Sequence, residues 1–229
     1  MTVLSAAQSA SIRLVGRKPT TLFSTTDQMA MELADLATET AVAIAKERDW
    51  TSLTKLAAIP GDGSTIGFPL PPDYDRMLIK GDVHSTTWNR FLYTPAVDLD
   101  QWLFFQTFLT VATPGYWIIL ENQMQVFPAM SADETAKFYY IRNTITADAT
   151  KTAFTADSDE FALDERLLTL GLIWRWRAQK RLEYAEDLKN YDIALAEIAG
   201  KDKGSRMITV GGTRGKFNTQ IAYPMAIQP

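Results

Sequence analysis

The chain has 229 residues, 46% of them hydrophobic and 22% charged, which suffices for one sizeable core. It contains no cysteine and a single histidine, which excludes disulfide bonds, thiolate nucleophiles and multi-histidine metal sites. No window holds the roughly 18 apolar residues of a membrane span, and "MTVLSAAQSASIRLVG" lacks the basic and apolar regions of a signal peptide. We therefore expect a globular protein that is made in the cytoplasm and has no membrane partner.

Charge is distributed unevenly along the chain. The net charge is −4, but residues 1–202 hold 19 basic and 27 acidic side chains and so carry −8. The segment after Asp202 has no acidic residue and four basic ones: Lys203, Arg206, Arg214 and Lys216. Because tight nucleic-acid binding needs clustered Lys and Arg, the acidic majority of the chain disfavours it.

Two helices are predicted near the N-terminus. Apolar residues at three- and four-residue spacing predict a helix over residues 4–15 that ends at Gly16. A second pattern predicts a helix over residues 26–48, with Thr26 or Asp27 as its N-cap. Together they form the first half of an expected helical bundle.

Residues 51–146 read as a β-rich insertion. The segment "PGDGS" is a hairpin turn signal, and "GYWIILENQMQVFPAM" and "AKFYYIRNTIT" are rich in strand formers. Between them, "PLPPDYDRMLIKGD" predicts a short turn of helix over Met77 and Leu78, and residues 98–109 predict a short buried helix. We expect a small antiparallel sheet here.

A long helix is predicted over residues 161–199. Its first half is apolar nearly all round, which requires burial on several sides, and its second half has a single apolar stripe. We place Leu167, Leu170 and Trp174 on one buried face, and assign Asp157, Asp159 and Glu160 to the acidic end of the helix dipole. At about 1.5 Å per residue, roughly 35 residues span about 50 Å, so we expect part of this helix to pack on another subunit.

The fold class we expect is therefore α+β and mainly α. A helical bundle with a long helix in the C-terminal half carries the small sheet insertion, and residues 1–202 form one body. Residues 203–229 form an extended C-terminal arm, because five glycines lie between positions 200 and 215 and large apolar residues are few. We expect this arm to be mobile in the free subunit and to become ordered on assembly.

Catalytic motifs are missing from the sequence. "GDGSTIG" is not a dinucleotide-binding fingerprint, "DSDE" is not a calcium loop, and His84 has no serine elbow to serve. A carboxylate pair for glycoside cleavage stays open, because a sequence does not give distances in space. The candidates for it are Asp73, Asp75, Asp98, Asp100 and Glu121. We expect no cofactor, no metal and no enzymatic activity.

The layout resembles a known family of virion proteins. A helix pair, the segment "PLPPDYDRML", aromatic strands ending in "FYYIRNTI", the helix start "LDERLLTLGLIWRWRAQK" and a basic, glycine-containing tail are similar to the head-to-tail adaptor (connector) proteins of tailed bacteriophages. The resemblance covers roughly residues 26–205. It implies a ring, usually of twelve copies, beneath the portal protein and above the tail or nozzle protein, with a C-terminal segment that reaches the portal. It places the protein at the head–tail junction of the virion, where DNA passes through the lumen without sequence-specific binding.

The expected subunit and portal interface draws on the long helix and the arm. Its residues are Trp174, Trp176, Arg177, Arg206, Ile208, Arg214, Lys216, Phe217, Ile221 and Tyr223. Stacking of the two tryptophans on nucleic-acid bases is the less favoured interpretation, since aromatic residues on a helix usually pack in a core. Two alternatives remain at this point: a cell-wall-degrading virion enzyme, with two carboxylates across a cleft, and a monomeric protein-binding module.

Overall fold

The computed structural model describes residues 2–79, 81–87, 92–108 and 115–202. The contacts between residues divide the chain into two compact units. The described part of the first, the helical unit, comprises residues 2–54 and 141–202, and that of the second, the sheet unit, lies between Lys55 and Tyr140. The chain passes from one to the other within two β-strands, so the sheet unit is an insertion between the two halves of the helical unit.

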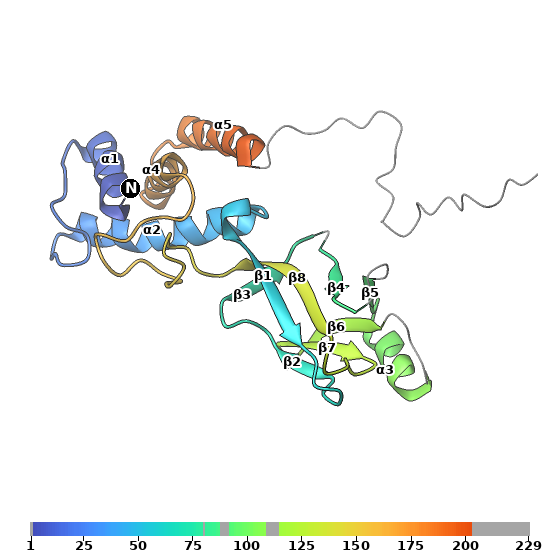
Figure 1. The fold of residues 1–229 in the computed structure, drawn as a ribbon. Helices are drawn as coiled ribbons and strands as arrows, with labels where there is room; N and C mark the ends of the chain where they lie inside the picture. The colour runs from blue at the N-terminus through green and yellow to red at the C-terminus, as the bar shows by residue number, and fades with distance from the viewer. Residues whose placement is uncertain (1, 80, 88–91, 109–114, 203–229) are drawn as a thin grey trace, which may run out of the picture. The chain divides into compact units, whose positions relative to one another are not determined.

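The helical unit contains four α-helices and one short 3-10 helix in its described residues (Figure 1). Their bounds are α1 Val3–Val15, α2 Gln28–Glu47, η1 Thr51–Leu53, α4 Glu165–Gln179 and α5 Ala185–Asp202. The first two lie where the sequence predicts helices. Gly16 ends α1 in the left-handed conformation, with φ of 72°, as the sequence also predicts.

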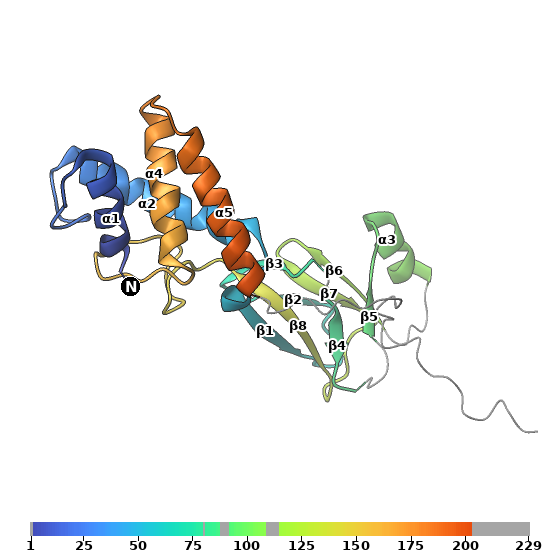
Figure 2. The same ribbon diagram turned by 90° about the horizontal axis from the view of Figure 1, so that it is seen from above.

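Helix α4 is the centre of the helical unit. It packs against α1, α2 and α5, and Figure 2 shows α1 and α5 on either side of it. Leu167, Leu168 and Leu172 are completely buried as a result, each contributing about 1.5–3 kcal/mol of hydrophobic stabilisation. This position explains why the first half of α4 is apolar nearly all round.

The predicted long helix over 161–199 is wrong, because two helices replace it. Arg181 lies between α4 and α5 in the left-handed region, with φ of 56°. The Arg181 N–H bonds to the Ala178 carbonyl at 3.0 Å, and the Leu182 N–H bonds to the Arg177 carbonyl at 2.9 Å. These two bonds form a Schellman motif, in which glycine is the usual left-handed residue. An arginine at that place hides the helix end from a sequence-based prediction.

The start of this helical region also differs from the prediction. Helix α4 begins at Glu165, and the Asp164 carboxylate caps it by accepting the Arg166 N–H at 2.7 Å. Asp157 and Asp159 lie outside the helix. The Asp157 carboxylate accepts the Leu22 N–H at 2.8 Å and so fixes its loop to the segment after α1, and Asp159 orders the loop itself. Asp159 accepts the Thr155 N–H at 2.8 Å and pairs with Lys151 at 2.6 Å. These carboxylates therefore stabilise the loop rather than the helix dipole.

The sheet unit contains eight strands in one mixed sheet, ordered β1-β8-β4-β5-β6-β7-β2, with β3 paired to β8 (Figure 1). The pair β5–β6 is parallel, whereas β4–β5, β4–β8, β6–β7 and β2–β7 are antiparallel. The bounds are β1 Thr54–Pro60, β2 Gly67–Pro69, β3 Tyr74–Met77, β4 Val83–Ser85, β5 Leu92–Pro95, β6 Tyr116–Leu120, β7 Gln123–Phe127 and β8 Thr135–Arg142. One helix, α3 Leu99–Phe108, belongs to this unit.

The expected mainly α fold with a small antiparallel sheet is therefore wrong. Among the described residues, 42% are helical and 23% lie in strands or isolated β-bridges, and the strands form this eight-stranded mixed sheet. Strands β2 and β4 have only three residues each, too few for a period-two pattern to be recognised. The short helix expected around Met77 is strand β3 instead, because its residues pair with β8.

The sheet unit has its own core, which includes Val83, Met124, Val126, Ala136 and Phe138. A buried carboxylate, Glu134, lies at its edge with 5% exposure. The Ser85 hydroxyl donates to Glu134 Oε1 at 2.5 Å, and the Tyr93 hydroxyl donates to the same oxygen. Burial, and secondly this carboxylate, raise the pKa of Tyr93. The three side chains tie β4, β5 and the start of β8 together.

Candidate assembly surfaces

The Trp-Arg segment of α4, residues 174–177, is engaged within its own chain. The Trp174 ring lies 6.4 Å from the Tyr184 ring and 6.1 Å from the Tyr191 ring, measured between centroids. The Arg175 guanidinium lies 4.9 Å above the Trp174 ring and pairs with Glu39 at 2.8 Å. This part of the segment therefore joins α4 to α2 and to α5.

Trp176 and Arg177, together with the following Lys180, also bind partners within the same chain. The Trp176 indole N–H donates to Glu32 Oε2 at 3.2 Å, and Lys180 pairs with Glu32 Oε1 at 2.7 Å. Arg177 pairs with Asp187 of α5 at 2.5 Å. The hydrogen bond from Lys180 lowers the pKa of Glu32 most, against its burial, and Gln28 and Trp176 contribute further. The interface role predicted for Trp174, Trp176 and Arg177 stays a prediction, since their contacts here are within one chain.

The remaining predicted interface residues lie outside the described residues. They are Arg206, Ile208, Arg214, Lys216, Phe217, Ile221 and Tyr223. Their place in an interface stays a prediction from the sequence.

A groove of about 880 Å³ lies on the helical unit, which we call the helical groove. Ser9 and Arg13 of α1, the first half of α4, and Asn190 and Ile193 of α5 border it. Its apolar lining consists of Phe161, Leu163, Leu170 and Ile193. Ile193 is 55% exposed, so one apolar wall is open to a partner.

A second hollow of about 410 Å³ continues this groove toward the end of α5. The two share Leu163, Asp164 and Arg166. The second hollow is lined also by Lys201 and Asp202, so the extended groove reaches the last residue that the structure describes.

Acidic side chains outnumber basic ones by one in the lining of the extended groove. Four carboxylates face three cations, and Glu197 pairs with both Arg166, at 3.4 Å, and Lys201, at 2.8 Å. Among the described residues, the carboxylates of Asp164, Glu165 and Asp202 form no ion pair. Each is held by hydrogen bonds instead, from the Arg166 N–H, the Ser5 hydroxyl and Thr51 respectively. These three carboxylates therefore have no cationic partner at ion-pair distance among the described residues.

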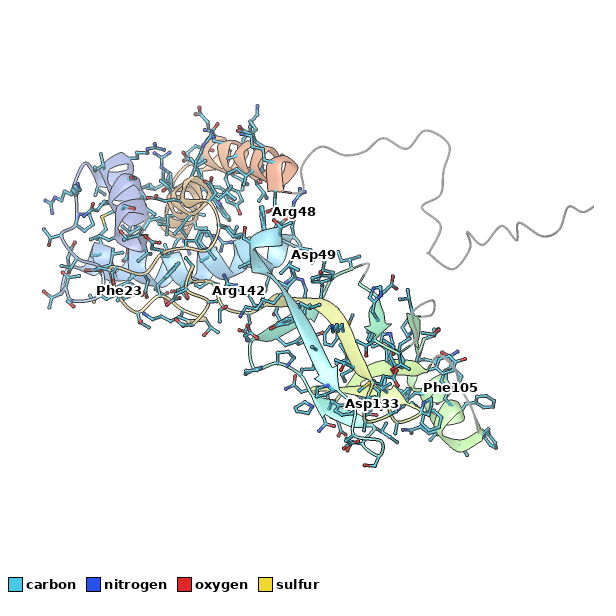
Figure 3. All side chains as sticks on the ribbon, viewed as in Figure 1. Phe23, Arg48, Asp49, Phe105, Asp133 and Arg142 are labelled. Carbon is cyan, nitrogen blue, oxygen red and sulfur yellow. The ribbon has the colours of Figure 1, made fainter. Side chains whose placement is uncertain are left out.

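An apolar face covers the outer side of α3 in the sheet unit. The inner side packs on the sheet: the Phe105 ring stacks on Tyr116 at 3.8 Å, and Trp102 meets Phe127 edge to face at 6.5 Å (Figure 3 labels Phe105). The outer side exposes four large apolar side chains: Leu99, Leu103, Phe104 and Phe108. Phe108 is 71% exposed and Leu103 62%. Contiguous exposed patches of this kind mark sites of protein interaction.

The carboxylates left open for glycoside cleavage have local roles. Asp73 pairs with Lys55 at 2.6 Å and accepts the Tyr140 hydroxyl at 2.7 Å, and Asp98 accepts the Gln101 N–H at the start of α3. Asp75 pairs with its neighbour Arg76, and Glu121 occupies a left-handed turn between β6 and β7. Asp73, Asp75 and Asp98 thus have partners within the sheet unit.

Other site types find no support among the described residues. They contain no group of three or more His, Asp or Glu side chains arranged to hold a metal ion. Within the same ranges, no helix combines the length and hydrophobicity required to cross a bilayer. His84 lies in β4, opposite Lys137 on β8 and Leu92 on β5.

These surfaces suit a protein that works by contacting other proteins. The family model described as SU10 adaptor protein matches residues 1–214. The chain therefore belongs to this family of phage head-to-tail adaptors. It is a bacteriophage virion protein of the head–tail junction that assembles with portal and tail proteins, and its family is structural rather than enzymatic. A comparison with curated proteins finds no match.

Proposed function

We propose that the protein forms a closed ring of twelve copies between the portal and the tail, and that DNA passes through its lumen. The observation that carries this proposal is the family match over residues 1–214, to which the structure adds two open surfaces on different units. When two different surfaces of neighbouring copies join head to tail, a ring results if the rotation closes. The outer face of α3 and the helical groove are two different open surfaces of the chain on which contacts with a neighbouring copy or another virion protein can form.

The charge distribution supports passage of DNA without adhesion. Residues 1–202 carry a net charge of −8, and a negative wall repels phosphate instead of binding it. A basic lumen would slow the DNA by forming phosphate contacts, each of which releases counterions. The charge of the chain thus fits a conduit better than a DNA-binding module.

The C-terminal segment supplies the second part of the proposal. Residues 203–229 carry four basic and no acidic side chains, together with strand-forming stretches such as "SRMITV". We assign these residues a role in assembly contacts, with the portal and a neighbouring adaptor as the two partners that the resemblance suggests. An extended segment that docks on a preformed surface is a common mode of such contacts.

Light scattering coupled to size exclusion tests the ring. The full-length protein is measured alone and after mixing with its portal protein. The proposal expects a mass twelve times that of one chain to join the portal. A protein that stays monomeric in both conditions would contradict it.

A further inference from the structure

The extended groove of the helical unit has no occupant among the described residues. We propose that the extended groove of each copy holds residues 203–229 of a neighbouring copy. This inference rests on the proposed ring and deepens it by naming the surface that receives the C-terminal segment.

The groove ends where the described chain ends. Asp202 lines its second part, and the Asp202 carboxylate accepts the Thr51 N–H at 2.9 Å and the Thr51 hydroxyl at 2.6 Å. The end of α5 is thereby fixed to η1, so the following 27 residues start from a defined point beside a groove. In a head-to-tail ring, the same point on every copy lies at the same distance from the groove of the next copy.

Charge complementarity favours this segment over other occupants. Asp164, Glu165 and Asp202 are the lining carboxylates that lack an ion pair within the described residues. The segment after Asp202 has a charge of +4 with no acidic residue to oppose it. Its charge is opposite in sign to the carboxylates of the groove that lack an ion pair.

One carboxylate oxygen in the groove, Glu165 Oε2, lacks a hydrogen-bond partner in the described part of the chain, and a cationic side chain would supply one. Glu165 Oε1 accepts the Ser5 hydroxyl at 2.5 Å, while Glu165 Oε2 is shielded from solvent and has no hydrogen-bond partner among the described residues. A buried carboxylate oxygen without a partner is costly, and an arriving Arg or Lys would satisfy it with a charge-assisted hydrogen bond. Arg206, Arg214 and Lys216 supply such donors.

The apolar part of the lining fits the same segment. Leu170 of α4 and Ile193 of α5 both line the groove and leave apolar surface uncovered. The segment offers Ile208, Ile221 and Tyr223, which are spaced by polar and glycine residues. An extended chain places such side chains in alternate pockets while its charged residues reach the rim.

The segment is long enough to reach the next copy. At about 3.3 Å per residue, 27 extended residues span up to about 90 Å, whereas α5, which borders the groove, has a length of about 27 Å. A segment that occupied its own groove would have to reverse at once beside α5 and would add nothing to the ring. If each copy places its C-terminal segment in the groove of the next copy, every groove is filled and every neighbouring pair of copies is joined.

Disulfide trapping tests the proposal, because the natural chain has no cysteine. Full-length Ile193→Cys is mixed with full-length Ile208→Cys, assembled with the portal and oxidised. We expect a covalent dimer on a non-reducing gel, and a ladder of multimers when one chain carries both substitutions. Met31→Cys replaces Ile193→Cys as the control, because Met31 is 49% exposed on α2 and does not line the groove. It is expected to give at most one-tenth of the dimer.

Three outcomes would overturn the proposal. In the doubly substituted chain, a disulfide that forms only within one molecule would show that each groove holds its own segment. A ring in which Ile208→Cys forms no disulfide with Ile193→Cys but forms one with a cysteine introduced on the portal would assign the segment to the portal. Rings that form with neither disulfide would leave the proposed function intact and reject the groove, whereas a chain that never joins the portal would reject the proposed function itself.

Charge gives a second readout. Glu165→Gln in the full-length chain keeps an acceptor for Ser5 but removes the negative charge at the unpartnered oxygen. We expect the yield of trapped dimer to fall about threefold to tenfold at low salt and to differ little at high salt. Glu186→Gln is the matched control, because Glu186 is exposed on α5 and does not line the groove. Equal yields for Glu165→Gln and the parent would contradict the role of this carboxylate.

Discussion

The helical unit and the sheet unit use their aromatic and apolar residues in opposite ways. In the helical unit, the Trp-Arg segment of α4, which the sequence suggests as an interface, is bound to α2 and α5 through Glu32, Glu39 and Asp187. In the sheet unit, α3 packs Trp102 and Phe105 inward and leaves four large apolar side chains outside. The comparison shows that an aromatic-rich helix is not by itself an interface. What separates the two is whether partners for these side chains exist within the same unit.

The largest expected effect is in the centre of the helical unit. Leu167→Ala removes a completely buried side chain of α4 and should lower the free energy of unfolding by about 2–5 kcal/mol. Leu170→Ala should cost clearly less, because Leu170 is only partly buried at the groove. Chemical denaturation of both variants measures the difference. Equal losses would mean that α4 is not buried as described.

A glycine provides the next test of the same packing. A Cβ atom at Gly171 would lie 2.4 Å from Thr40 Cγ2, so Gly171→Ala should push α4 from α2 and cost about 1–3 kcal/mol of unfolding free energy. Gly200→Ala is the control, since nothing lies within 4 Å of a Cβ there, and it should be neutral or stabilising by up to about 1 kcal/mol. If thermal unfolding showed the two substitutions to have the same effect, the close packing of α4 on α2 at Gly171 would be contradicted.

A smaller effect is expected from pH. The folded-state pKa of Glu32 is lowered from its ordinary value of 4.5, chiefly by the hydrogen bond from Lys180. Its contribution is therefore present above pH 4.5 and lost as the pH falls through the folded pKa. Glu32→Gln should remove at most about 1 kcal/mol at pH 7, and its deficit relative to the parent should shrink toward pH 3. A deficit that does not change with pH would show that the ion pair contributes nothing.

The smallest effect on stability belongs to the outer face of α3. Phe108→Ser should change the free energy of unfolding by less than about 0.5 kcal/mol, because the side chain is 71% exposed. The same substitution should reduce assembly with the portal or tail, whereas Phe105→Ser should unfold the helix from the sheet. The size of the assembled complex, measured for each variant together with its unfolding free energy, distinguishes Phe108→Ser from Phe105→Ser. If Phe108→Ser assembled like the parent, the outer face would not be an assembly surface.

The sequence predicts the helices better than the sheet, for identifiable reasons. Gly16 and the apolar periodicity of α2 are local signals, and both helices lie where those signals place them. The break at Arg181 depends on a left-handed arginine, which no propensity favours. Strands as short as β4 depend on pairing with residues far along the chain, and such pairing leaves no local pattern.

The candidate surfaces are likewise only partly predictable from the sequence. The apolar character of residues 99–108 is visible in the sequence, but which of its aromatics face outward depends on the strands beneath them. Glu134 has no sequence signal either, because its partners Ser85 and Tyr93 come from two other strands. The extended groove brings together residues from Ser9 to Asp202, so only the folded helical unit reveals it.

The most direct measurement of the central claim is a cryo-EM reconstruction of the head–tail junction of the virion. We expect a ring of twelve copies of this chain between portal and tail, with contacts on the outer face of α3 and with residues 203–229 lying in the extended groove of the next copy. A junction in which the chain is absent, or is present as isolated copies that do not touch one another, would contradict it.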